Sequence, residues 1–168
     1  MSGAGGPDLA VDASGLSVVI VAGSWHEVVM DGLIASAQRE CERAGAAHRL
    51  IRVPGCFELP VVAQEVAERD DVDAVICLGV IIRGGTPHFD FVANAATDGL
   101  TRVALDTRTP VGFGVLTCDD EAQALDRSGI PGSSEDKGAE AMAAVLATAV
   151  TLREIDRIKR PYPGFTPS

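Results

Sequence analysis

A chain of 168 residues, 46% of them hydrophobic, is long enough to bury the core of one domain. Its 24 acidic side chains outnumber the 14 basic ones, and the formal net charge of −10 argues against nucleic acid or an anionic membrane as the main partner, since both need a basic face. The four cysteines form no C-x-x-C pair and the three histidines are scattered, so the sequence predicts neither a bound metal ion nor a disulfide framework. No apolar run reaches membrane-spanning length and the first fifteen residues do not resemble a signal peptide, so we expect a cytoplasmic protein.

The first half of the chain alternates apolar runs with helical patterns. After a small, Gly-rich segment, which predicts a mobile or partner-docked tail, a buried strand is expected at residues 16–22. Residues 27–44 carry apolar side chains at helical spacing, and Gly45 follows as the terminating residue. A second strand is expected at residues 47–53 and a second helix at residues 57–69.

The second half repeats the alternation. A very apolar third strand is expected at residues 72–82, followed by a helix at residues 88–106 with Thr86 as its N-cap and Pro87 as its first residue. The remaining elements are a strand at 111–117, a short helix at 119–127 and a long helix from 135 or 136 to about 158. We therefore expect one domain over residues 16–160, between an N-terminal tail of residues 1–15 and a frayed tail of residues 161–168.

This order predicts an α/β fold, a three-layer αβα sandwich around a four-stranded parallel sheet. Ligands of such sheets bind beyond the carboxyl ends of the strands. The segments that follow the four strands are residues 23–26, 54–58, 83–88 and 117–120. We expect them to line up along one edge of the sheet.

The junction between the third strand and the third helix offers an anion site beside a proton-transfer group. The pair Gly84-Gly85 leaves backbone N–H groups free at the positive end of a helix, which suits a phosphate. His88 follows in the first helical turn, and an imidazole gives and takes protons near neutral pH. Many strand–turn–helix junctions with glycine bind nothing. The residues of the other loops are therefore needed to distinguish a ligand site from a junction without one.

The last helix is apolar around nearly its whole circumference between Ala139 and Leu152. A helix of this kind must be covered on more than one side, which favours a homo-oligomer. The alternative is tight, Ala-rich packing within one chain.

Taken together, the loops resemble the 6,7-dimethyl-8-ribityllumazine synthase family. The matching segments are Ser24-Trp25-His26, Pro54-Gly55-Cys56-Phe57-Glu58-Leu59-Pro60, Gly79 to Asp90, Phe113-Gly114-Val115-Leu116-Thr117, and Ala124-Leu125-Asp126-Arg127 followed by Glu135-Asp136-Lys137-Gly138. They occur in family order and at family spacing from about Leu16 to about Glu154. Each segment alone is modest, and the set is specific.

The resemblance implies a flavodoxin-like fold, whose sheet a neighbour's N-terminal strand can extend. It also implies an activity in riboflavin biosynthesis, the condensation of 5-amino-6-(D-ribitylamino)uracil with 3,4-dihydroxy-2-butanone 4-phosphate, with loss of water and phosphate. The family needs no metal and no organic cofactor, and it builds its active sites at the interfaces of homo-oligomers.

Residue roles follow from the resemblance, position by position. Trp25 takes the place of the aromatic side chain that stacks on the pyrimidine, where Phe is frequent. Glu58 holds ribityl hydroxyls beside the backbone of Cys56 and Phe57, although it also suits the first turn of a helix. Cys56 departs from the usual Ala or Ser, which a backbone contact tolerates. Ile81 and Ile82 frame the pyrimidine through their main chains.

The phosphate-binding roles fall on the third loop and on a neighbouring subunit. Gly85 and Thr86 match the phosphate turn, Arg127 the guanidinium that clamps the same phosphate from the adjacent subunit, and His88 the proton-transfer group. Phe113 matches a residue that enters the neighbour's pocket, and Lys137 one near the polar chain of the substrate. Arg83 is assigned a structural role. The implied set comprises the catalytic residues His88 and Arg127 and the substrate-binding residues Trp25, Cys56, Phe57, Glu58, Ile81, Ile82, Gly85, Thr86, Phe113 and Lys137.

The linker between Gly129 and Lys137 is longer and carries Pro131, unlike the shorter turn of members that build icosahedral shells. It predicts a pentamer, or two pentamers, in place of a shell. Two other functions stay open at this point. One is a flavodoxin-like carrier that binds flavin without catalysis, although the loop after the first strand lacks the Ser/Thr-rich phosphate loop of such carriers. The other is a ligand-storage oligomer descended from the enzyme, against which the intact set of Glu58, His88 and Arg127 argues.

Overall fold

Four parallel strands form the sheet, in the order β2-β1-β3-β4. The structure, a computed structural model, describes residues 9–157 of the 168, so the predictions for residues 1–8 and 158–168 lie outside it. The strands are β1 (Ser17–Ala22), β2 (Ala47–Arg52), β3 (Ala74–Ile82) and β4 (Val111–Cys118). Registers such as Val19 opposite Val75 and Cys77 opposite Phe113 set the strands side by side, with their carboxyl ends at one edge.

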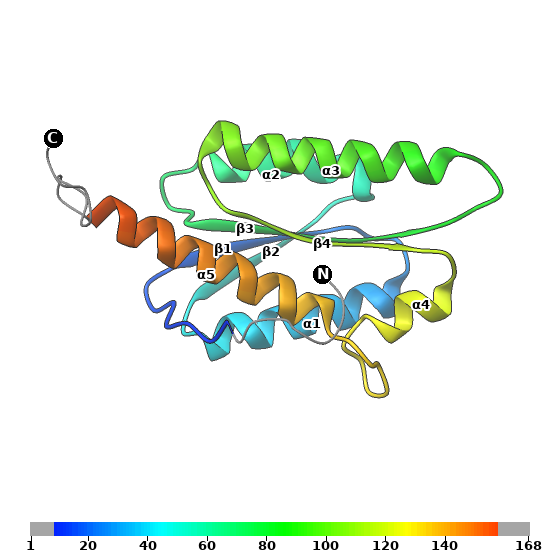
Figure 1. Ribbon diagram of the computed structural model, residues 1–168, viewed down its shortest axis with the longest axis horizontal. Coiled ribbons are helices and arrows are strands. Elements are labelled where there is room, and N and C mark those ends of the chain that lie inside the picture. Colours follow the sequence, from blue (N-terminus) through cyan, green and yellow to red (C-terminus); the bar gives the residue numbers. More distant parts are fainter. Residues whose placement is uncertain (1–8, 158–168) are drawn as a thin grey trace, which may run out of the picture.

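Helices cover both faces of this sheet, as Figure 1 shows. On one face lie α1 (Glu27–Arg43), the short α4 (Glu121–Asp126) and α5 (Lys137–Arg157); on the other lie a 3-10 turn η1 (Cys56–Glu58), α2 (Leu59–Ala67) and α3 (His88–Thr107). The predicted three-layer αβα sandwich with a four-stranded parallel sheet, in the flavodoxin-like style, is confirmed.

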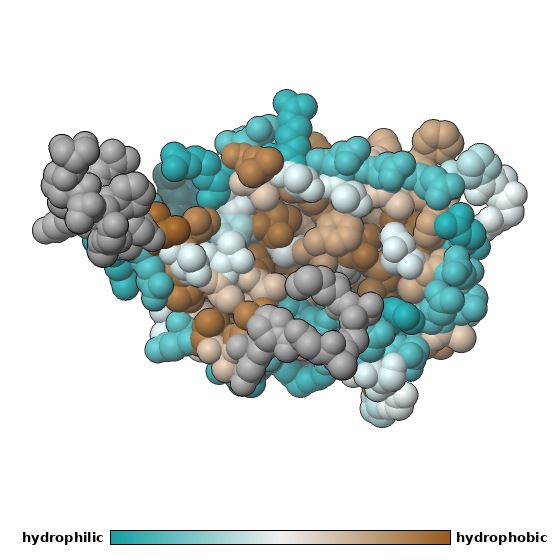
Figure 2. Space-filling view, viewed as in Figure 1, coloured by the Kyte–Doolittle hydropathy of each residue, from teal (hydrophilic) through white to brown (hydrophobic). Residues whose placement is uncertain are grey.

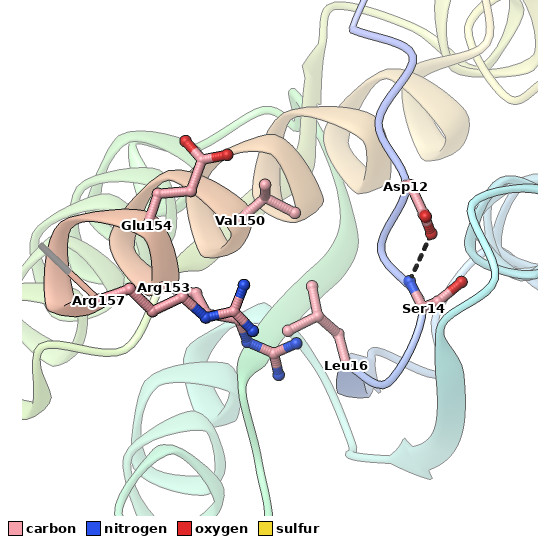
Figure 3. Close-up of a pocket in the computed structure, with 7 residues that line it drawn as sticks. All are labelled: Asp12, Ser14, Leu16, Val150, Arg153, Glu154 and Arg157. Atoms are coloured by element: carbon pink, nitrogen blue, oxygen red, sulfur yellow. Dashed lines mark hydrogen bonds between the residues drawn. The ribbon is translucent and has the colours of Figure 1, made fainter.

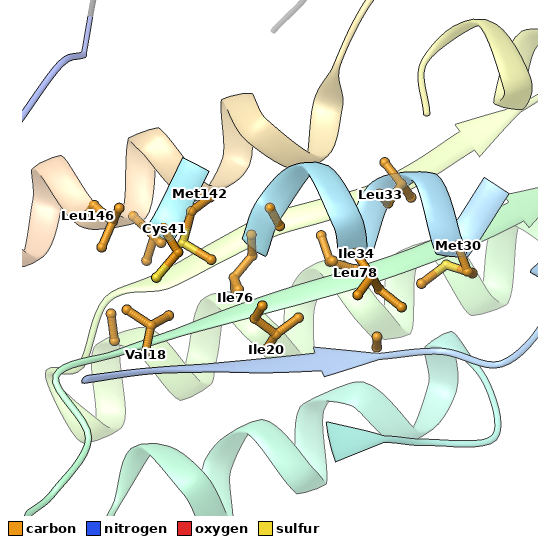
Figure 4. Close-up of a cluster of buried hydrophobic side chains, with 14 of the residues drawn as sticks. Val18, Ile20, Met30, Leu33, Ile34, Cys41, Ile76, Leu78, Met142 and Leu146 are labelled. Atoms are coloured by element: carbon orange, nitrogen blue, oxygen red, sulfur yellow. The ribbon is translucent and has the colours of Figure 1, made fainter. Parts of the chain in front are cut away.

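The alternation of side chains along the strands divides the core in two. On β1, Val18 and Ile20 pack under α1 and α5, whereas Val19 and Val21 pack under α2 and α3. Figure 4 shows the α1/α5 side of this core, a single cluster that extends from Met30 and Leu33 on α1, past Ile76, to Met142 and Leu146 on α5. Most of β3 is buried on both faces, as expected of a central parallel strand.

Several of the apolar side chains around α5 are buried within the chain. Met142, Val145, Leu146 and Ala149 are buried against α1 and the sheet, and the other positions between residues 139 and 150 are mainly alanines. One side of this helix is therefore covered within the chain, and cover of its other side by a second subunit stays a prediction. Large exposed apolar side chains occur on the α2/α3 layer (Phe57, Val61, Phe91 and Leu105) and also near the end of α5 (Leu152 and Ile155).

Two helix starts differ from the sequence prediction. Pro87, not Thr86, is the N-cap of α3, because the carbonyl of Pro87 is the first to accept a bond, from the N–H of Asp90 at 3.1 Å. The predicted helix at residues 57–69 is a 3-10 turn followed by α2, with Pro60 in the first turn of α2.

The third strand begins two residues later than predicted. Asp73 precedes it, where its carboxylate accepts the N–H of Ser17 at 2.7 Å and an N–H of Arg153 at 3.2 Å. Within the N-terminal segment expected as a tail, Ala13 is buried and its N–H donates to Ala44 O at 2.8 Å. The division into tails and one domain stays a prediction.

Candidate active site

The loops after β1 and β2 are bonded to each other and to β3. The hydroxyl of Ser24 donates to Val53 O at 2.7 Å, and the N–H of Gly23 donates to Leu78 O at 3.0 Å. The first two loops therefore meet at the carboxyl edge of the sheet, and the N–H of Arg83, which donates to Cys118 O at 2.9 Å, joins the third loop to the end of β4 at the same edge.

An exposed indole stands at this edge beside a carboxylate. Trp25 is 71% exposed, and it precedes His26, whose φ of 59° is a left-handed conformation that turns the chain sharply into α1. A Cβ added to Gly55 would lie 3.5 Å from Trp25 Cδ1 and 3.3 Å from Glu58 Oε2. Gly55 therefore leaves room for the indole and the carboxylate to flank one stretch of backbone.

Cys56 joins the second loop to β3. Its Sγ lies 3.7 Å from Val80 O, and a Cβ on Gly79 would lie only 2.5 Å from that sulfur, so this close approach needs glycine. Burial raises the pKa of the Cys56 thiol to about 11, which keeps it protonated and unreactive. The neighbouring Phe57 is 65% exposed.

The end of β3 places its two isoleucines on opposite faces. Ile81 is buried with the α2/α3 core, while Ile82 is half-buried and packs against the α1/α5 core. Because the two side chains point to opposite faces of the sheet, only the backbones of Ile81 and Ile82 can lie together at the site.

The turn at residues 83–88 is open. A Cβ on Gly84 or Gly85 would meet nothing within 4 Å, and Thr86 and His88 are exposed. Within the described part of the chain, neither the hydroxyl of Thr86 nor the imidazole of His88 makes a hydrogen bond. Both groups are free to meet a ligand.

A second cluster of charges lies where α4 ends and α5 begins. Glu135 Oε1 is 3.7 Å from Arg127 Nε, and Glu135 Oε2 is 2.5 Å from Lys137 Nζ, which also pairs with Glu140 at 2.8 Å. The Lys137 ammonium lowers the pKa of Glu135, and although burial works against it, these carboxylates raise the pKa of Lys137. Arg127 Nη1 donates to Gln123 O at 2.9 Å.

Phe113 does not join the loops of its own chain. It lies in the middle of β4 opposite Cys77 and is 46% exposed on the edge strand, about 17 Å before the strand ends at Cys118. Figure 2 shows apolar surface between α3 and α5, in the region that β4 crosses. Phe113 is therefore available to a neighbouring molecule.

Two hollows of the described surface lie toward the other end of the sheet. One, of about 250 Å³, is lined by Asp12, Ser14, Leu16, Val150, Arg153, Glu154 and Arg157 (Figure 3). Its residues precede β1 or belong to the last turns of α5, far along the strands from the loops above. Within residues 9–157 no group of His, Cys, Asp and Glu side chains has the arrangement of a metal site. No helix in that range is long and apolar enough to cross a membrane.

Two charged residues beside these loops were not among the predicted site residues, and Arg83 had been assigned a structural role. Arg83 stacks on the ring of Phe89, and Glu135 bridges Arg127 and Lys137. A signal existed for Glu135, because an acidic residue between two expected site cations suggests an ion-pair network. None existed for the stacking of Arg83, which depends on the path of the turn.

The fold and its loops are those of a flavodoxin-like α/β protein, with aromatic, polar and glycine residues gathered at the carboxyl edge of its sheet. The family model described as 6,7-dimethyl-8-ribityllumazine synthase matches residues 15–153. The chain belongs to this family and is an enzyme of the transferase class.

Relatives bearing the same name are similar over nearly their whole length. The protein of Leifsonia xyli subsp. xyli is 65% identical over 157 residues, which cover 92% of this chain and 99% of the relative. Those of a Nocardioides species and of Streptomyces avermitilis are 62% and 59% identical over 157 residues, each covering 92% of this chain and 97% of the relative. The family match disfavours a non-catalytic flavin carrier.

Proposed function

We propose that the chain condenses 5-amino-6-(D-ribitylamino)uracil with 3,4-dihydroxy-2-butanone 4-phosphate to 6,7-dimethyl-8-ribityllumazine, with release of phosphate and water, in riboflavin biosynthesis. One observation carries the proposal: identity of 65% to a lumazine synthase across 92% of the chain. The exposed, unbonded groups of the loops are the chemical support.

The pyrimidine half of the site is assigned to the first two loops and the end of β3. The exposed face of Trp25 stacks on the pyrimidine ring, and the Glu58 carboxylate beside it accepts hydrogen bonds from ribityl hydroxyls. The backbones of Cys56, Phe57, Ile81 and Ile82 line the ring. This arrangement explains why a buried thiol is tolerated at Cys56, since its sulfur points toward Val80 O.

The phosphate half combines the open turn with a cation. Gly85 and Thr86 supply N–H and hydroxyl donors, and Arg127 of an adjacent subunit supplies a planar guanidinium suited to two phosphate oxygens. Lys137 lies near the polar chain of the substrate, and Phe113 enters the neighbour's pocket.

His88 moves the protons of the reaction. An amine of the pyrimidine forms a C–N bond to the ketone carbon, and the carbinolamine oxygen leaves as water once protonated. Loss of a proton from C3 of the butanone-derived imine then expels phosphate from C4, and the enol that remains takes up a proton at C4 to become a ketone at C3. The ribitylamino nitrogen closes the ring onto this ketone carbon with loss of a second water. An imidazole with no hydrogen bond in the described chain is available to relay these protons, a contribution of typically about 10²–10⁴-fold. Holding the two substrates together contributes as well.

The working unit is proposed to be a cytoplasmic homo-oligomer, a pentamer or two pentamers. The exposed apolar side chains of the α2/α3 layer, with Phe113 on β4, support contact between copies. The linker with Pro131, longer than in members that build shells, supports the smaller assembly. A monomer would then lack a complete active site.

Mixing the purified protein with both substrates tests the proposed function. We expect the absorbance and fluorescence of the lumazine to appear, together with one equivalent of inorganic phosphate. Protein that arrives with bound flavin and forms no product would instead identify a carrier. Protein that binds the lumazine tightly and releases no phosphate would identify a storage oligomer.

A further inference from the structure

The turn that carries Gly85, Thr86 and His88 has little support of its own. Its glycines have open space around them, and α3, which follows it from His88, has Pro87 as N-cap and no hydrogen bond from a capping side chain. The hydroxyl and imidazole that follow make no hydrogen bond within residues 9–157. Something other than these residues must fix where their donors point.

Arg83 connects the two ends of this turn. Its guanidinium carbon lies 4.1 Å from the centroid of the Phe89 ring, on the far side of the turn. Its Nη1 lies 3.7 Å from Asp90 Oδ1, so both contacts join residue 83 to the first turn of α3. A planar guanidinium stacked on a ring is a favourable, orientation-dependent contact.

Arg83 is itself anchored to the last strand. Its N–H donates to Cys118 O at 2.9 Å, and its Nε lies 3.2 Å from Asp119 Oδ1. The pair of carboxylates, Asp90 and Asp119, faces the one guanidinium, which leaves it a poor ligand for a further anion. Each exposed ion pair is weak alone, but the contacts share one side chain and act on one turn.

We propose that Arg83 is a positioning residue: stacked on Phe89 and held by Asp90 and Asp119, it keeps the turn at residues 84–88 in the shape that presents its phosphate donors and His88. This inference rests on the proposed function for the identity of the anion. Arg83 does not itself touch the substrate. It acts through Phe89, and the two residues are coupled.

The variants Arg83→Ala and Phe89→Leu and their combination test the coupling in the full chain. Phe89→Leu keeps an apolar side chain against the α2/α3 core but removes the ring face. We expect Arg83→Ala to raise KM for the butanone phosphate about tenfold and to lower kcat, and Phe89→Leu to raise that KM about threefold. The double variant should be no worse than Arg83→Ala, and KM for the pyrimidine should not change.

Arg102→Ala is the matched control. Arg102 lies on α3, as Phe89 does, and pairs with Asp106 at 2.9 Å. It is highly exposed, and its ion pair lies more than three helical turns from the turn at residues 84–88. We expect its kinetic constants to match those of the unaltered chain. Arg83→Lys keeps the charge but loses the planar stack, so its KM should lie nearer to that of Arg83→Ala than to that of the unaltered chain.

Hydrogen exchange gives a readout that does not depend on activity. We expect the amides of residues 91–94, in the first turns of α3, to exchange about tenfold faster in Arg83→Ala than in Arg102→Ala. Faster exchange in a chain that makes no lumazine would leave the positioning role intact and overturn only the proposed function. An active chain in which Arg83→Ala changes neither exchange nor KM would overturn the positioning role. So would additive effects of the two variants, which would mean that Arg83 meets the phosphate directly.

Discussion

The turn at residues 83–90 and the loop at residues 126–137 are proposed to serve the same phosphate, yet they are held in opposite ways. The turn is exposed, and its ends are joined chiefly by the side chain of Arg83. The loop is cross-linked through its backbone: Glu135 N–H donates to Asp126 O at 3.0 Å, and Lys137 N–H donates to Arg127 O at 3.0 Å. A short bridge also pairs Ser128 with Asp136.

The two segments also differ in the chemical groups that they offer to a phosphate. The turn offers neutral donors and an imidazole, while the charge of Arg83 is balanced by Asp90 and Asp119. The loop offers a guanidinium and an ammonium already gathered around Glu135. Substitutions in the turn should therefore alter turnover with little change in stability, whereas substitutions in the loop should alter both.

The largest expected effect belongs to the turn. Replacing His88 with Ala should lower kcat about 10²- to 10⁴-fold, because the proton relay is lost, while the pyrimidine still binds. Steady-state kinetics and titration with a pyrimidine analogue would separate the two effects. His48→Gln, which alters a histidine on β2 paired with Glu42 at 3.2 Å, is the control. Equal loss of binding and rate would show that His88 mainly shapes the pocket.

The next effect belongs to the loop. Replacing Arg127 with Ala should raise KM for the butanone phosphate about 10- to 100-fold, the usual value of a hydrogen bond to a charged group. KM for the pyrimidine should change much less. Arg39→Ala is a control beside the same loop, since Arg39 only approaches Asp136 at 3.8 Å on the surface. An unchanged KM for the butanone phosphate would remove the assigned role of Arg127.

A smaller effect concerns the stability of the loop. Bonds from Ser134, at 2.5 and 3.0 Å, lower the pKa of Asp126 below its ordinary value of 3.8. A lowered pKa in the folded state means that the carboxylate stabilises the fold above the unfolded pKa and loses this contribution as the pH falls through the folded value. Asp126→Asn should thus lower Tm at pH 7 and have a smaller effect at pH 3. An equal Tm difference at both pH values would contradict this reading.

The architecture could be predicted from the sequence because apolar runs, helical spacing and glycine positions agree with one another. The run at residues 74–82 is buried on both faces, as its composition indicated, and Gly45 has the left-handed φ of 80° expected after α1. The cap of α3 was predicted wrongly because Thr86 precedes Pro87 in a favourable pattern, but the helix begins one residue later, with Pro87 as N-cap and no hydrogen bond from a capping side chain. Burial of Met142, Val145, Leu146 and Ala149 within the chain accounts for part of the apolar circumference of α5, and cover by a second subunit stays a prediction.

The candidate site could be predicted only for residues whose position follows from the strand that precedes them. Trp25 and Glu58 follow strands, so their gathering at one edge follows from the parallel sheet. The contact of Arg83 with Asp119 spans 36 residues and depends on how β3 and β4 end. The spacing of these residues gives no sign of this contact, nor of the stacking of Arg83 on the partly buried ring of Phe89.

Mixing two impaired variants tests the central claim, that loops of one copy and Arg127 of the next form each active site. His88→Ala and Arg127→Ala chains carrying different tags would be co-expressed, and oligomers that hold both tags would be isolated. With random mixing, about a quarter of the sites would combine an intact His88 with an intact Arg127. Assayed at a butanone phosphate concentration well below the KM of the unaltered chain, where both variants are slow, the mixed oligomers should therefore show about a quarter of the full activity. Mixed oligomers no more active than the two variants alone would show that each copy supplies both residues to its own site.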